Sequence, residues 1–361
     1  MNQGIGKTVL QDLRRDDLTR SVRQDWRELK QFFLDDERRT RLRRMGVIRR
    51  AFVQAWWLLK RLILSLTPAR RLLLLVAIVC AMTGTLRFSA DGARVSLNLD
   101  DVGFAIFLLL IMLEVKDKLL ARSELEAGRK VQAALIPAES PRFEGWQIYM
   151  FTRPANTVGG DLVDYLRLAG NRLGLALGDV AGKGLGAALM MAKLQATLRA
   201  LAPDLPSLKL LGERMNEIFC RDGMPQRFAS LVYLEIQPSS GLVRLLNAGH
   251  LPPVLLHARG EIESLPRGAP ALGIMHGASF EETTCTVEPG DLLVVTSDGV
   301  VEARDESGRF FGDERLQTEL RSSASGAAET VGRAILTAVD AFVGEAPRSD
   351  DLSLIILRRL V

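Results

Sequence analysis

The chain has 361 residues, 47% hydrophobic residues and a formal net charge of +4. This length favours two domains, and the apolar content is sufficient for a large core, which excludes a largely disordered protein. The three cysteines, Cys80, Cys220 and Cys285, form no CxxC pair. Their spacing excludes a disulfide framework and a cysteine zinc site, so we expect reduced thiols, as in a cytoplasmic catalytic domain.

The charge is unevenly distributed along the chain. Residues 1–71 contain 18 Lys and Arg against 8 Asp and Glu, a net charge of +10, which leaves −6 for the remainder. A basic N-terminal arm indicates an anionic partner, either nucleic acid or lipid. Because apolar runs follow the arm and it contains no nucleic-acid motif, we expect a membrane and no nucleic acid as its partner.

Residues 1–67 are predicted to form a basic amphipathic helical N-terminal region. Trp26, Leu29 and Phe32 indicate one amphipathic helix, for which a solvated and partly ordered arm is the alternative. Residues 51–66 indicate a second amphipathic helix. It carries Trp56 and Trp57, residues of the type found at membrane interfaces.

Two uncharged apolar runs predict a two-helix transmembrane hairpin over residues 68–115. The runs are residues 72–86 and 102–113, and both are shorter than the roughly 20 residues that span a bilayer. Flanking arginines and lysines would therefore have to snorkel, and two buried helices of a soluble domain are the alternative. Basic flanks on both sides predict a multi-pass protein of the bacterial inner (cytoplasmic) membrane, with the catalytic domain in the cytoplasm.

Residues 116–137 are predicted to form a connector helix that ends at Pro137. A stiff helix between membrane and catalytic domain can transmit rotation or form a homodimer contact, and a plain spacer helix is the alternative.

Residues 138–361 are predicted to form the catalytic domain. Short β segments alternate there with turn signals, as in the hairpin across Ala169-Gly170-Asn171, and pairs of helices lie between them. The helices are expected at residues 185–201, 207–220, 313–322 and 327–342. This order excludes a doubly wound parallel sheet and predicts an α+β fold of packed antiparallel sheets covered by helices.

Four acidic segments lie far apart in this domain, and all but one adjoin an apolar run of strand type. They contain Asp161 after two glycines, Asp179 between Gly178 and Val180, Asp298 before Gly299, and the pair Asp350 and Asp351. Any one of them is explained by a turn, but four together predict carboxylates gathered at strand ends. Oxygen ligands without cysteine suit Mg²⁺ or Mn²⁺, so our working hypothesis is hydrolysis at a carboxylate metal site.

The order of these motifs resembles the bacterial stage-II-sporulation-E/RsbU-type branch of the PP2C-like (PPM) serine/threonine phosphatases. The motif Asn247-Ala248-Gly249-His250 and the segment Val-Gln-Ala-Ala-Leu-Ile-Pro at residues 131–137 also match. The resemblance covers about residues 125–361. It implies a PP2C-like β-sandwich flanked by helices, in α-β-β-α layers, with two Mn²⁺ or Mg²⁺ ions at one end.

The same resemblance implies the roles of individual residues. Asp179 would bridge both ions, and the backbone carbonyl of Val180 would be a further ligand. Asp161, Asp298 and Asp350 would supply the other carboxylates, with Asp351 kept open as a ligand beside or instead of Asp350. Two ions would activate a water molecule for in-line attack on phosphorus, so no enzyme nucleophile is required.

The sequence thus predicts a membrane-anchored, metal-dependent protein serine/threonine phosphatase. Its substrate would be a phosphorylated regulatory protein, by resemblance an anti-sigma-factor antagonist. The alternative is a catalytically silent membrane signalling protein with the same fold, against which the complete set of aspartates argues. A nuclease would need a basic strip that the acidic C-terminal region lacks. We expect a structural role for His250, and for Arg153 the role of an exposed loop charge.

Overall fold

The computed structural model describes residues 46–90, 93–222, 227–238 and 240–360. The chain divides into two compact units, residues 1–119 and 120–361. The amphipathic helix predicted around Trp26 lies outside the described residues.

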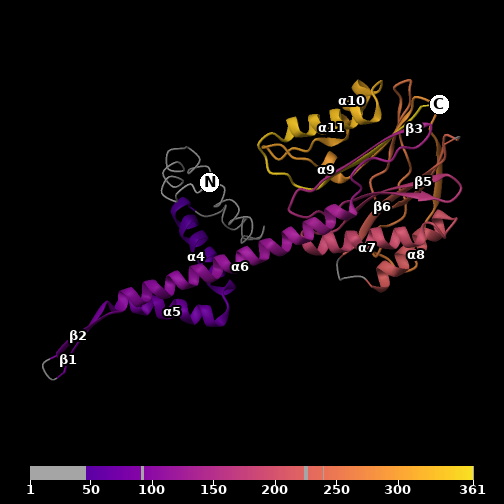
Figure 1. Ribbon diagram of the computed structural model, residues 1–361. Helices are drawn as coiled ribbons and strands as arrows, with labels where there is room; N and C mark the ends of the chain where they lie inside the picture. The colour runs from indigo at the N-terminus through magenta and orange to yellow at the C-terminus, as the bar shows by residue number, and fades with distance from the viewer. Residues whose placement is uncertain (1–45, 91–92, 223–226, 239, 361) are drawn as a thin grey trace, which may run out of the picture. The chain divides into compact units, whose positions relative to one another are not determined.

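The described residues of the first unit form helices and a β-hairpin (Figure 1). These elements are α4 (Val47–Ser65), α5 (Pro68–Thr83), β1 (Thr85–Ala90), β2 (Ala93–Asn98) and the first part of α6 (Leu99–Leu135). Arg70 on α5 joins α6 through ion pairs with Glu114 and Asp117, at 2.7 and 2.6 Å. The chain between α5 and α6 lies largely in the antiparallel strands β1 and β2.

No helix in the described part of the chain is both long enough and apolar enough to cross a membrane. Helix α5 has 16 residues, which rise about 24 Å, less than the roughly 30 Å of a hydrocarbon core. Helix α6 has 37 residues, but charged side chains, Asp100, Asp101 and Glu114 among them, bound its apolar run on both sides. The transmembrane hairpin predicted for residues 68–115 is therefore not supported.

The second unit is built on two five-stranded antiparallel sheets. The first sheet has the order β10 (Glu282–Thr286), β7 (Leu242–Ala248), β6 (Ala229–Ile236), β5 (Arg172–Val180) and β4 (Leu162–Leu168). The second has the order β3 (Trp146–Arg153), β12 (Leu352–Arg359), β11 (Leu292–Thr296), β8 (Val254–Leu256) and β9 (Ile262–Ser264).

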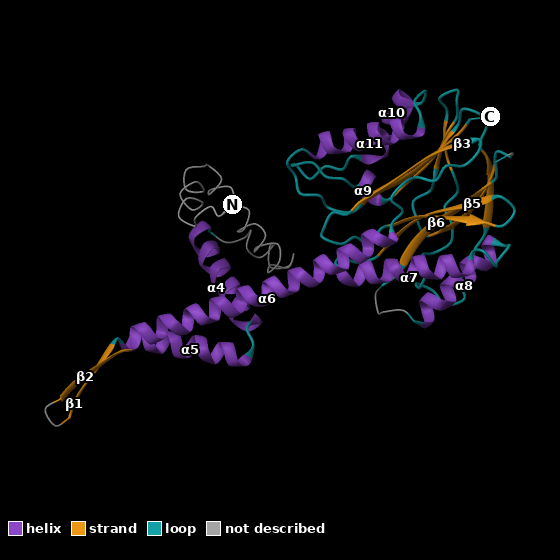
Figure 2. Cartoon of the chain, viewed as in Figure 1, coloured by secondary structure: helices purple, strands orange, loops and turns teal. Residues whose placement is uncertain are grey.

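Helices cover the outer face of each sheet, as Figure 2 shows. Helices α7 (Leu185–Leu201) and α8 (Leu208–Arg221) pack on the first sheet, and α10 (Gly312–Ser323) and α11 (Ala328–Val343) pack on the second. The short α9 (Asp298–Val301) follows β11 directly. The layers are therefore α-β-β-α, and the predicted α+β architecture is confirmed.

Strand β11 shows why the central layers form. All five of its residues are buried, and they alternate between two cores because side chains of a strand point to opposite faces. Leu293 and Val295 pack between the sheets, whereas Leu292 and Val294 pack under α10 and α11. A strand that is apolar on both faces fits only where another layer covers each side, and this places β11 in the interior of the sandwich.

Candidate active site

The candidate metal-binding aspartates come from both sheets. Asp161 directly precedes β4, and Asp179 lies near the end of β5; Leu162 pairs with Gly178, so the two aspartates lie at the same end of the first sheet. Asp298 follows the end of β11, and Asp350 precedes the start of β12, which pairs antiparallel with β11. The four aspartates far apart in sequence therefore meet at one end of the sandwich.

The carboxylates interact strongly with one another. The pKa of Asp298 is raised to about 6, chiefly by burial and then by the charges of Asp179 and Asp350. Burial and the neighbouring Asp179 raise the pKa of Asp161 well above its ordinary value. Burial and the charge of Asp350 likewise raise the pKa of Asp179. Negative charges held this close indicate a site that protons or cations must neutralise.

Gly160 and a buried oxygen of Asp161 complete this acidic site. A Cβ at position 160 would lie 3.0 Å from the carbonyl oxygen of Val180, so the glycine lets the chain pass close to this carbonyl and to Asp179. Oδ2 of Asp161 is buried without a hydrogen-bond donor. A carboxylate oxygen without a donor is a ligand of the kind that hard cations use.

The carboxylate of Asp351 accepts hydrogen bonds from backbone amides in and next to the loop before Asp161. Its Oδ1 accepts a hydrogen bond from the amide of Ala155 at 2.7 Å, and its Oδ2 accepts bonds from the amides of Gly160 at 2.6 Å and Asp161 at 3.4 Å. Only a glycine fits at position 159, since a Cβ would overlap this carboxylate. Asp350 is exposed by contrast, with Nζ of Lys183 3.7 Å from its Oδ2. The geometry thus favours Asp350 over Asp351 as a ligand.

Gln132, near the end of α6, holds the same loop from the other side. Its side chain is 5% exposed. Its Nε2 donates to the carbonyl of Gly159 at 2.7 Å, and its Oε1 accepts from the Gly159 amide at 3.0 Å. The sequence analysis did not assign this residue a role, although the segment 131–137 that contains it was among the matching motifs.

His250 is buried beside the site and is neutral at pH 7, because burial lowers its pKa to about 4. Its Nδ1 lies 2.7 Å from Oγ of Ser230, and its backbone forms hydrogen bonds with the side chain of Asn247. These contacts fit the structural role expected from the sequence. Arg153 differs from the expectation: it lies on β3 and forms a bidentate ion pair with Asp340 of α11, at 2.6 and 3.0 Å. This ion pair links β3 to α11, so Arg153 has a structural role.

A cavity of about 440 Å³ opens beside the carboxylates. Asp179, Asp298, Glu302, His250 and Arg267 contribute to its lining. Among the described residues, no three His, Cys, Asp or Glu side chains already converge as a metal-binding group. The fit to divalent cations rests instead on the donor-free Oδ2 of Asp161 and on the mutual repulsion of the aspartates.

Solved structures share this arrangement of sheets and helices. The SiaA-PP2C domain of Pseudomonas aeruginosa aligns with a TM-score of 0.57 and 19% identity, over 67% of this chain and 98% of that one. The RsbU and RsbW domains of Rv1364c from Mycobacterium tuberculosis align with a TM-score of 0.55 and 25% identity, over 63% of each chain. The second unit therefore has the PP2C-like fold.

The model of the Stage II sporulation protein E (SpoIIE) family matches residues 169–360, and the chain belongs to this family of PP2C-like phosphatases. Protein IcfG of Synechocystis sp. is 30% identical over 247 residues, which are 61% of this chain and 39% of IcfG. Phosphoserine phosphatase RsbU of Bacillus subtilis is 25% identical over 241 residues, which are 66% of this chain and 71% of RsbU. The chain thus spans well under half of IcfG and about seven tenths of RsbU.

Proposed function

We propose that the protein is a metal-dependent protein serine/threonine phosphatase that hydrolyses phosphoserine or phosphothreonine on a regulatory protein. The observation that carries the proposal is the cluster of aspartates from two sheets, whose pKa values are raised by burial and by one another, beside an open cavity. Membership of a phosphatase family supports the same activity. RsbU, a relative, is named a phosphoserine phosphatase, which favours a phosphoprotein as the substrate.

In this proposal Asp161, Asp179, Asp298, Asp350 and the Val180 carbonyl hold two Mn²⁺ or Mg²⁺ ions. Bound divalent cations supply positive charge that lowers the pKa of water and offsets the charge of a phosphoryl group. The chain itself positions the ligands. Asp351 and Gln132 fix the loop before Asp161, and the neutral His250 supports the wall of the cavity through Ser230.

The test is hydrolysis of a phosphoserine peptide and of p-nitrophenyl phosphate by the full chain with Mn²⁺. We expect EDTA to abolish activity, and Asp179→Ala and Asp298→Ala each to lower kcat at least ~100-fold, since both variants remove transition-state charge stabilisation. Asp204→Ala, in an exposed turn after α7, is the matched control and should keep full activity. Metal-independent hydrolysis, or activity that survives in both variants, would reject the proposal.

The cellular location and the oligomeric state remain predictions from the sequence. A multi-pass location in the bacterial inner membrane was expected from the two apolar runs and their basic flanks. A homodimer was expected through residues 116–137, which lie largely in α6. Cell fractionation and light scattering of the purified chain would test them.

A further inference from the structure

A second cavity, of about 380 Å³, adjoins the acidic one. Leu251, Pro252 and Arg267 line both cavities, so the two lie side by side. The lining of the second cavity is mixed in character, since α10 contributes both the apolar Leu316 and the acidic Asp313. Two adjacent cavities, one of which contains the carboxylates, have the form expected for a peptide segment of which only one residue reaches the reaction centre.

Arg267 lies where the two cavities meet, on a backbone that is fixed on both sides. The amide of Leu265 donates to the carbonyl of Pro253 at 2.9 Å, and the amide of Ala269 donates to the carbonyl of Asn247 at 3.0 Å. Gly268 lies so close to Asn247 that a Cβ would overlap its carbonyl. The segment that carries Arg267 is therefore tied to the Asn247–His250 loop at the edge of the acidic cavity.

The guanidinium group of Arg267 is exposed, and in the part of the chain that the structure describes no ion pair or hydrogen bond of its side chain is found. It is the one Lys or Arg among the described residues that line either cavity. It forms no ion pair with Asp179, Asp298 or Glu302, so it lies beside the carboxylate cluster rather than within it. A free cation on a fixed backbone next to the reaction centre is suited to bind an anionic group of the substrate.

We propose that Arg267 is a specificity-determining residue: it binds a carboxylate that the phosphoprotein substrate carries beside its phosphorylated residue, and the second cavity receives the adjacent part of the same segment. This inference deepens the proposed phosphatase function and rests on it. The shared lining residues provide the argument, because Arg267 belongs to the walls of both cavities and therefore flanks a segment that extends from the acidic cavity into the second one.

The test uses the full chain with Mn²⁺ and two phosphoserine peptides that differ only in their flanking residues, Glu in one and Lys in the other. For the unaltered chain we expect the Glu peptide to have the higher kcat/KM, by about threefold to tenfold, as for one exposed charge pair. Arg267→Ala should remove this preference through a higher KM for the Glu peptide, and should change p-nitrophenyl phosphate hydrolysis no more than hydrolysis of the Lys peptide. Ser264→Trp, at the lining of the second cavity, should raise KM for both peptides but not for p-nitrophenyl phosphate.

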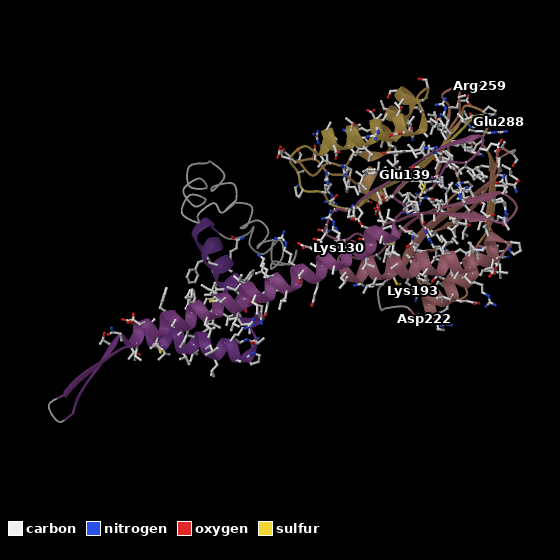
Figure 3. The ribbon with its side chains drawn as sticks, viewed as in Figure 1. Lys130, Glu139, Lys193, Asp222, Arg259 and Glu288 are labelled. Atoms are coloured by element: carbon white, nitrogen blue, oxygen red, sulfur yellow. The ribbon has the colours of Figure 1, made fainter. Side chains whose placement is uncertain are left out.

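Arg259→Ala is the matched control. Arg259 is equally exposed but lies in the turn between β8 and β9 (Figure 3), whereas Arg267 follows β9 at its other end. This variant should keep the preference for the Glu peptide. If Arg267→Ala slows both peptides and p-nitrophenyl phosphate alike, the residue serves the phosphoryl group and the inference fails. If the preference persists in Arg267→Ala, it also fails. If the unaltered chain hydrolyses none of the three compounds, the phosphatase proposal fails, and the inference fails with it.

Discussion

Asp350 and Asp351 are adjacent in the sequence, but their carboxylates have different surroundings. Asp351 is 6% exposed and accepts hydrogen bonds from three backbone amides of the loop before β4. Asp350 is exposed, and its charge acts on Asp179 and Asp298. The motif alone left both open as ligands, because sequence spacing does not reveal which side chain of a pair points into the fold.

This contrast predicts different defects for the two alanine variants. Asp351→Ala leaves buried amides without acceptors, so the free energy of unfolding should fall by about 2–4 kcal/mol. Asp350→Ala should change it by less than about 0.5 kcal/mol and should instead weaken Mn²⁺ binding. Urea unfolding and calorimetric titration with Mn²⁺ measure the two effects. A stable Asp351→Ala protein, or undiminished Mn²⁺ affinity in Asp350→Ala, would contradict the assignment.

The pKa of Asp298 predicts a pH dependence of stability. The value is about 6 in the folded protein against an ordinary 3.8. Between these values the folded state binds more protons than the unfolded state, so the contribution of Asp298 to stability falls as pH rises through this window. In EDTA, the free energy of unfolding of Asp298→Asn relative to the unaltered chain should increase by about 1 kcal/mol from pH 4 to pH 7, after discounting for partial exposure.

Urea unfolding at both pH values measures this change. Mn²⁺ in excess should reverse the order of stability at pH 7, because it binds the unaltered chain more tightly. If the difference in the free energy of unfolding between Asp298→Asn and the unaltered chain is the same at both pH values, then neither burial nor the charges of the cluster raise the pKa of Asp298.

At the scale of elements, α6 is continuous from Leu99 to Leu135, and its last turns are part of the second unit. Besides Gln132, the carbonyl of Leu135 accepts a hydrogen bond from Gln195 of α7 at 2.7 Å. The connector helix was predicted from its composition, but its contact with the Gly159 backbone was not. One glutamine forms no repeating sequence pattern, so the sequence could not indicate which backbone group the side chain of Gln132 contacts. Only the folded chain shows this contact.

We expect Gln132→Leu to weaken Mn²⁺ binding about tenfold, since both backbone groups of Gly159 lose their partner and the loop before Asp161 is less well positioned. The free energy of unfolding should also fall, by about 1–3 kcal/mol. Lys130→Ala is the control, because Lys130 is exposed on the same helix (Figure 3). Calorimetry with Mn²⁺ well below the unfolding temperature separates the two effects, and unchanged affinity would assign Gln132 to stability alone.

At the scale of the whole molecule, the sequence predicted the sandwich well and the first unit poorly. The alternation of apolar residues and the turn at Gly170 and Asn171, both with positive φ, are local signals that the sheets retain. In the first unit the apolar runs were interpreted as membrane spans. That interpretation is not supported, because no helix in the described residues is both long enough and apolar enough for such a span: α5 ends at Thr83, and the residues after it enter a β-hairpin.

The division into two units predicts that residues 120–361 fold alone. This fragment retains both sheets, the four covering helices and the contacts of Gln132. Its thermal transition should lie within a few degrees of the corresponding transition of the full chain, measured by circular dichroism. A fragment without cooperative unfolding would mean that residues 1–119 are part of its core.

The placement of two aspartates on each sheet has a consequence for how the protein tolerates change in its interior. Leu177, Val295 and their neighbours pack between the sheets, and the strands that carry these residues lead to Asp179, near the end of β5, and to Asp298, just after β11. Because a close-packed interior transmits a change of one methylene to its surroundings, a replacement there alters the spacing between the two halves of the acidic cluster. Under the proposed function, selection on ion affinity would therefore extend to residues that contact neither ion nor substrate, and catalysis as well as folding would constrain the core between the sheets.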